Sequence, residues 1–74
     1  MKLNLLSCGA KRPDRRAIAK CLTEVASNME ESLSDELTGM FLEGEVVEIE
    51  VEDKKSSSAL RAFRKLSIDY EIVE

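Results

Sequence analysis

Histidine and tryptophan are absent from this chain, and other residues that often carry chemistry are scarce. Its 74 residues include two cysteines, one tyrosine, two phenylalanines and one proline. Without histidine, the usual general base at neutral pH is missing. The cysteines, Cys8 and Cys21, form no CxxC pair, so we expect two buried small hydrophobic residues rather than a metal site or a disulfide. We therefore predict no catalytic residue, no metal and no cofactor, and a protein that is not an enzyme.

Long apolar runs are also absent, because no stretch approaches the roughly 20 residues of a membrane span. The apolar stretch within residues 1–8 is too short for a signal peptide and is typical of a strand. We expect a cytoplasmic globular protein that does not enter the membrane. A chain of this length gains about as much from apolar burial as it loses in conformational entropy, so a disulfide, a metal or a second subunit would add the missing stability.

Charge is arranged in blocks that the net charge of −4 conceals. Residues 1–20 carry six bases and one acid, whereas residues 21–53 carry eleven acids and no base. Residues 54–65 then carry five bases, and residues 66–74 carry three acids. This order predicts a molecule whose surface is electrically polar.

Hydrophobic periodicity predicts a single α+β domain over residues 1–74. We expect a strand near residues 3–6, a helix over 14–31, a hairpin of 37–42 with 45–52, a helix near 59–66 and a strand over 68–73. Two helices would then cover one face of a three- to four-stranded, mainly antiparallel sheet in β-α-β-β-α-β order. This arrangement is KH-like or ferredoxin-like.

The expected hairpin turns at residues 43–44 and places Met40 opposite Val47 on the core face. Phe41 and Val46 would then lie together on the other face, which the two helices cannot cover. We predict a self-association surface formed by Leu37, Phe41 and Val46, and hence a homodimer. Scattered surface apolar residues, which are normal in monomers, are the alternative.

A basic cluster lies at the start of the first expected helix and comprises Lys11, Arg12, Arg15, Arg16 and Lys20. Solvated helix charge, contact with RNA and docking of a protein all remain open for it. The chain offers neither an interleaved aromatic platform nor a GXXG-like loop, which weakens the RNA interpretation.

Residues 44–53, in which a glycine precedes an alternating acidic strand, are followed by Ser58-Ala59-Leu60-Arg61-Ala62. This pattern resembles the small dimerising subunit of the KEOPS complex, the CTAG/Pcc family, over about residues 36–66. The resemblance implies a non-catalytic scaffold that dimerises and holds the catalytic subunit, which adds threonylcarbamoyl to an adenosine of certain tRNAs. It also implies that Arg15, Arg61 and Arg64 meet this partner.

We therefore predict a non-catalytic scaffold subunit that supports tRNA modification. Arg12, Arg15, Arg16, Arg61 and Arg64 are its expected partner or RNA contacts. A small RNA-binding module that uses the basic first helix is the alternative. A small acylphosphatase-like enzyme is a second alternative, based only on the order of the elements, and the chain lacks the arginine and asparagine loop expected of it.

Overall fold

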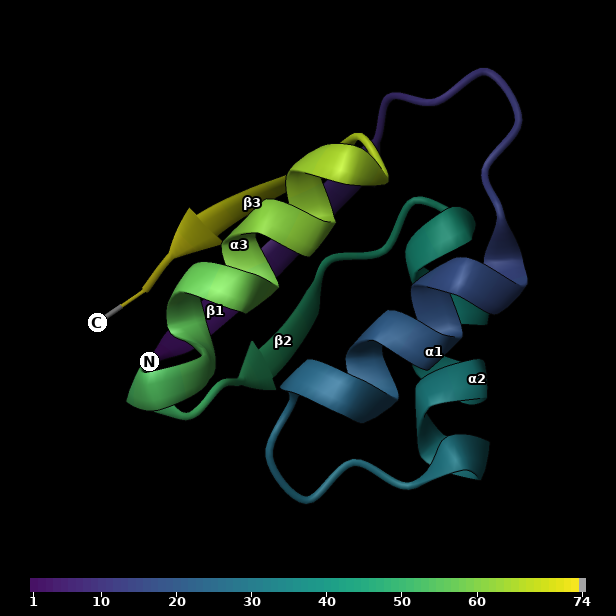
Figure 1. Ribbon diagram of the computed structural model, residues 1–74. Helices are drawn as coiled ribbons and strands as arrows, with labels where there is room; N and C mark the ends of the chain where they lie inside the picture. The colour runs from purple at the N-terminus through teal and green to yellow at the C-terminus, as the bar shows by residue number, and fades with distance from the viewer. Residues whose placement is uncertain (74) are drawn as a thin grey trace.

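The computed structural model describes residues 1–73, which form three strands and three α-helices (Figure 1). In chain order these are β1 (Lys2–Cys8), α1 (Arg15–Val25), α2 (Glu31–Leu42), β2 (Val47–Glu50), α3 (Ser56–Lys65) and β3 (Ile68–Ile72). A short 3-10 turn, η1 (Asp53–Lys55), precedes α3. The α+β class is confirmed, although the element order is β-α-α-β-α-β.

The strands form one antiparallel sheet in the order β2-β1-β3. On the central strand, Leu3 lies opposite Ile49, and Leu5 lies opposite both Val47 and Tyr70. Because side chains alternate along a strand, these residues share one face of the sheet. Val47 and Ile49 are buried, as their alternation with glutamates predicts.

The predicted hairpin is wrong, because residues 37–42 form the second half of α2. β2 pairs with β1 instead, so Val47 lies opposite Leu5 and not opposite Met40. The central strand of the sheet is therefore supplied by the N-terminal segment, which is far away in sequence.

Gly44 explains why the hairpin pattern misleads. Its φ angle is +98°, and its backbone N–H donates to the carbonyl oxygen of Phe41 at 3.1 Å. A glycine in this left-handed conformation just after the last turn is a common way to end an α-helix. The same residue type at the same place in the sequence also suits a hairpin turn.

The predicted helix over 14–31 is too long, because α1 ends at Val25 and α2 begins only at Glu31. The backbone N–H of Ser27 then donates to the carbonyl oxygen of Glu50 at 2.7 Å, which ties the chain to the end of β2. Asn28 has a φ of 54°, a left-handed conformation that asparagine tolerates. The chain reverses direction there, so α2 runs back along α1 instead of continuing its course.

The helices lie over the sheet face that bears Leu3 and Leu5, and in Figure 1 α3 crosses in front of β1 and β3. α1 lies between α3 and α2, and α2 also contacts β1 and β2. One core joins both layers, with its largest fully enclosed side chains at Phe41, Phe63, Leu3, Leu5, Ile18 and Leu22. Three helices, rather than the two expected, therefore cover one face.

The opposite face of the sheet is left open by residues 1–73, and apart from the half-buried Leu6 its strand residues are polar. Those exposed there are Lys2, Glu48, Glu50, Asp69 and Glu71, around the half-buried Asn4. A polar face of this kind is well solvated and needs no cover. The expectation that Phe41 lies on this face is wrong, because Phe41 is buried in the core. Val46 is exposed and directly precedes the inward-facing Val47, so strand alternation places it on the open side, as expected.

Candidate functional site

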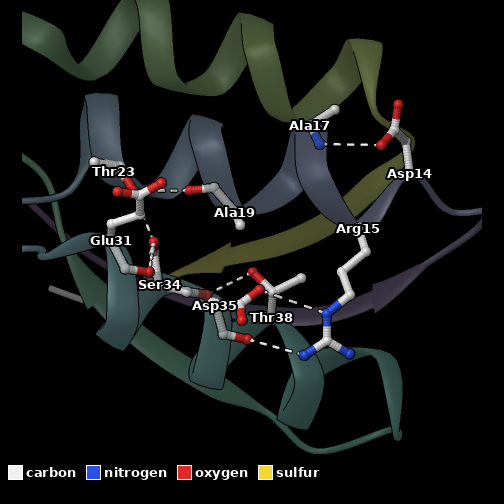
Figure 2. Close-up of polar contacts among 9 residues, drawn as sticks. All are labelled: Asp14, Arg15, Ala17, Ala19, Thr23, Glu31, Ser34, Asp35 and Thr38. Carbon is white, nitrogen blue, oxygen red and sulfur yellow. Dashed lines mark hydrogen bonds and ion pairs between the residues drawn. The ribbon is translucent and has the colours of Figure 1, made fainter.

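The contact between α1 and α2 is built from small and hydroxyl-bearing residues. Ser34 and Thr38 of α2 are both fully buried at this contact. The hydroxyl of Thr38 donates to the carbonyl oxygen of Ser34 at 2.6 Å, and the Ser34 and Thr23 hydroxyls lie 2.7 Å apart (Figure 2). No buried side-chain polar atom within residues 1–73 lacks a partner. The Thr23–Ser34 contact therefore joins α2 to α1 with its polar atoms satisfied, beside the apolar core that Phe41 of α2 shares with Ile18 and Leu22 of α1.

Two charged residues, Asp14 and Arg15, lie at the start of α1, where this helix contacts α2. Asp14 caps the helix, because its Oδ1 accepts a hydrogen bond from the backbone N–H of Ala17 at 3.1 Å. Next to it, Arg15 reaches across to α2, where its Nε lies 3.6 Å from Oδ1 of Asp35 (Figure 2). The Arg15 guanidinium also covers Gly39, where an added Cβ would lie 3.1 Å from Nη2. The predicted helix start at Asp14 is confirmed.

An open groove of about 750 Å³ runs along the outside of this contact. Arg16 and Lys20 of α1 line one wall, and Glu31 and Asp35 of α2 line the other. The groove thus has walls of opposite charge, which attract each other across it.

The five predicted partner or RNA contacts are all exposed, but they do not form one cluster. Arg12 precedes α1, Arg15 and Arg16 lie in its first turn, and Arg61 and Arg64 lie on α3. Only Arg15 is engaged with an acid, Asp35, within residues 1–73. Four of the five arginines therefore lie on the neighbouring helices α1 and α3, Arg12 lies in the segment before α1, and Arg15 is the one that pairs with α2.

The three predicted self-association residues do not form one exposed surface. Phe41 is only 2% exposed and belongs to the core, so its assignment to a surface is wrong. Leu37 is half-buried on α2, and Val46, just before β2, is 56% exposed. The helical period of α2 explains the difference, because Phe41 lies on the same side as Ser34 and Thr38 and turns inward with them.

A different set of apolar side chains lies on the outside of α2. Leu33 is 41% exposed and Met40 is 37% exposed, with Leu37 between them at helical spacing. The backbone N–H of Glu45 donates to the carbonyl oxygen of Met40 at 3.1 Å, so the segment that leads to β2 starts at this end of α2. We call Leu33, Leu37 and Met40 the α2 stripe.

Sequence reasoning missed Leu33 and Met40 as surface residues, because it ended the first helix at residue 31, before Leu33, and placed Met40 on the core face of a strand over 37–42. A signal for them exists in the spacing i, i+4, i+7, which Leu33, Leu37 and Met40 follow. The same spacing relates Ser34, Thr38 and Phe41, so the pattern alone left open which of the two sets turns inward.

The two cysteines are free thiols and differ in burial. Cys21 of α1 is buried, and this burial, followed by the charge of Glu24, raises the pKa of its thiol from 9.0 to about 11. Cys8 is half-buried, and its Sγ lies 3.5 Å from the carbonyl oxygen of Leu66. Cys21 is therefore protonated and unreactive at neutral pH.

Residues 1–73 contain no group of three or more potential ligands that could hold a metal ion. None of the helices in this part of the chain is both long and apolar enough to cross a membrane.

Comparisons with protein-family models, curated proteins and solved structures found no match to the chain. The resemblance of residues 36–66 to the small KEOPS subunit therefore stays a prediction.

Proposed function

We propose that the protein is a non-catalytic subunit that binds a partner protein through the α2 stripe. The observation that carries this proposal is the orientation of α2, which turns Ser34 and Thr38 inward and exposes Leu33 and Met40. Leu33 and Met40 thus leave apolar surface in contact with water, and a partner that covered them would gain free energy, since full burial of a leucine or methionine contributes about 1.5–3 kcal/mol.

An exposed row of apolar side chains on one helix is typical of a surface that a partner covers. Methionine is enriched at protein interfaces, and the half-buried Leu37 joins the exposed ends of the stripe to the core. The polar contact with α1 holds this helix in one orientation, so the stripe is presented on a fixed support.

The resemblance to the KEOPS small subunit would make the partner a catalytic subunit and the process tRNA modification. The matching residues, 36–66, run from within α2 to the end of α3 and include Leu37 and Met40 of the α2 stripe. The same resemblance also predicts homodimerisation. Binding of a catalytic subunit and homodimerisation would each place the protein in a complex, as the proposed binding surface requires.

Direct RNA contact is the second candidate, favoured by the exposure of Arg12, Arg16, Arg61 and Arg64. This candidate predicts that the protein binds tRNA, and that the binding weakens steeply as the salt concentration rises and when Arg12 and Arg16 are replaced by alanine. Absence of tRNA binding at low ionic strength would contradict this candidate.

Site-specific photocrosslinking in the cell of origin tests the main proposal. A photoreactive amino acid at Met40 should crosslink to a protein partner, with the crosslinked residue identified by mass spectrometry. The matched control places the same group at Ile72, which is 51% exposed at the end of β3. Equal crosslinking from both positions, or none from Met40, would contradict the proposal.

A further inference from the structure

The α2 stripe is bordered by acids that have no basic neighbour along the chain. Glu36 lies within the stripe, three residues after Leu33 and four before Met40. Glu43 and Glu45, between α2 and β2, are exposed at its C-terminal end. Residues 21–53 contain no base, and these three acids form no ion pair within residues 1–73. The apolar row thus has a border of exposed acids that make no ion pair, while Arg15 of α1 lies nearby over Gly39 and pairs with Asp35.

We propose that the occupant of the α2 stripe is a basic amphipathic helix of another protein. This inference rests on the proposed function and adds the chemistry of the partner. Leucine-like side chains of the partner would cover Leu33, Leu37 and Met40, and flanking lysines or arginines would face Glu36 and Glu43. Partner surfaces of complementary potential favour association and its specificity.

The dimensions of the stripe fit a helix. Leu33 and Met40 are seven residues apart, which spans about 10.5 Å along a helix axis, or two turns. Two helices in contact interdigitate side chains at three- and four-residue spacings, which is the spacing of this stripe. An extended strand would present side chains about 6.8 Å apart on one face, which does not match the helical rows.

A second copy of the chain fits less well. A two-fold α2–α2 contact would place Glu36 and Glu43 near their own copies, and like charges oppose such a contact. A head-to-tail contact could bring Arg16 and Lys20 of α1 to the acidic border. The exposed side of α1 carries Arg16, Lys20, Thr23 and Glu24, so it offers charge without an apolar row.

The test uses three synthetic helical peptides with the same leucine row. One has lysine flanks, one has glutamate flanks, and one has the composition of the first in scrambled order. We expect the lysine-flanked peptide to bind the whole protein with amide shifts concentrated on α2, as measured by NMR titration. Binding should weaken as salt rises, because exposed charges are screened.

Two matched variants then separate the apolar and charged contributions. Leu33→Ser should weaken binding of the lysine-flanked peptide about fivefold, since it removes a partly exposed apolar contact. Glu36→Lys should weaken that peptide and strengthen the glutamate-flanked one. Ile72→Ser, which alters an exposed apolar residue outside the stripe, should leave both affinities unchanged.

The outcomes distinguish this inference from the proposed function. If the glutamate-flanked peptide binds equally well, or if sedimentation shows that a second copy buries the stripe, the basic partner is wrong and the binding surface stands. If the lysine-flanked peptide shifts residues outside α2, the basic partner is also wrong. If no peptide binds and photocrosslinking from Met40 yields no protein, both proposals fail.

Discussion

Substitution of Phe41 by alanine distinguishes a core position from a surface position in α2. Phe41 is 2% exposed and is among the largest enclosed side chains. Removing a buried phenylalanine costs about 3–5 kcal/mol, because apolar burial is lost and a cavity is left. A domain of this size has a free energy of unfolding of about 4–11 kcal/mol, so the variant should lose about a quarter of it or more.

Urea denaturation followed by far-UV circular dichroism measures this loss. Val46→Ala is the matched control, and we expect a change within about 0.5 kcal/mol because that side chain is 56% exposed. Phe41→Glu should fail to fold, whereas a surface phenylalanine would tolerate the charge. A Phe41→Ala variant within 1 kcal/mol of the natural protein would refute the inward orientation of α2.

Three further predictions concern the helix end, the buried hydroxyls and the buried thiol. Gly44→Ala should lower the free energy of unfolding by about 1 kcal/mol in urea denaturation, because alanine is strained at a φ of +98°, and an unchanged midpoint would contradict the helix cap. Thr38→Val should cost about 1 kcal/mol by removing the hydrogen bond to Ser34, and a more stable variant would show that this bond contributes nothing. Since burial raises the pKa of Cys21 to about 11, the folded protein holds its thiol proton more tightly than the unfolded chain. Stability should then be unaffected below pH 9 and fall between about pH 9 and 11, with a smaller fall in Cys21→Ala.

Regular patterns with one buried face were predicted well from sequence. In β2, valine and isoleucine alternate with glutamate, so the period of two identifies both the strand and its inward side. In α3, Ala59 and Phe63 recur at helical spacing and are fully buried. In each case the apolar residues are the ones that turn inward, so hydrophobicity and burial agree.

The second helix could not be predicted in this way, because hydrophobicity and burial disagree along it. Ser34 and Thr38 are buried together with Phe41, while Leu33 and Met40 are partly exposed, so apolar residues occur on both the inner and the outer side of this helix. The pairing of β1 with both other strands was also hidden, since it depends on contacts between distant parts of the chain. The prediction of Leu37 and Val46 as surface residues was based on a hairpin, whereas Leu37 lies half-buried on α2 and Val46 lies exposed just before β2.

Solvent exposure of the side chains of α2, measured in the free protein by NMR, tests the orientation on which the proposed function depends. A water-soluble paramagnetic agent should broaden the methyl signals of Leu33 and Met40 strongly and leave the methyl signal of Thr38 sharp. Equal broadening of Met40 and Thr38, or protection of Leu33 with broadening of Thr38, would contradict the account.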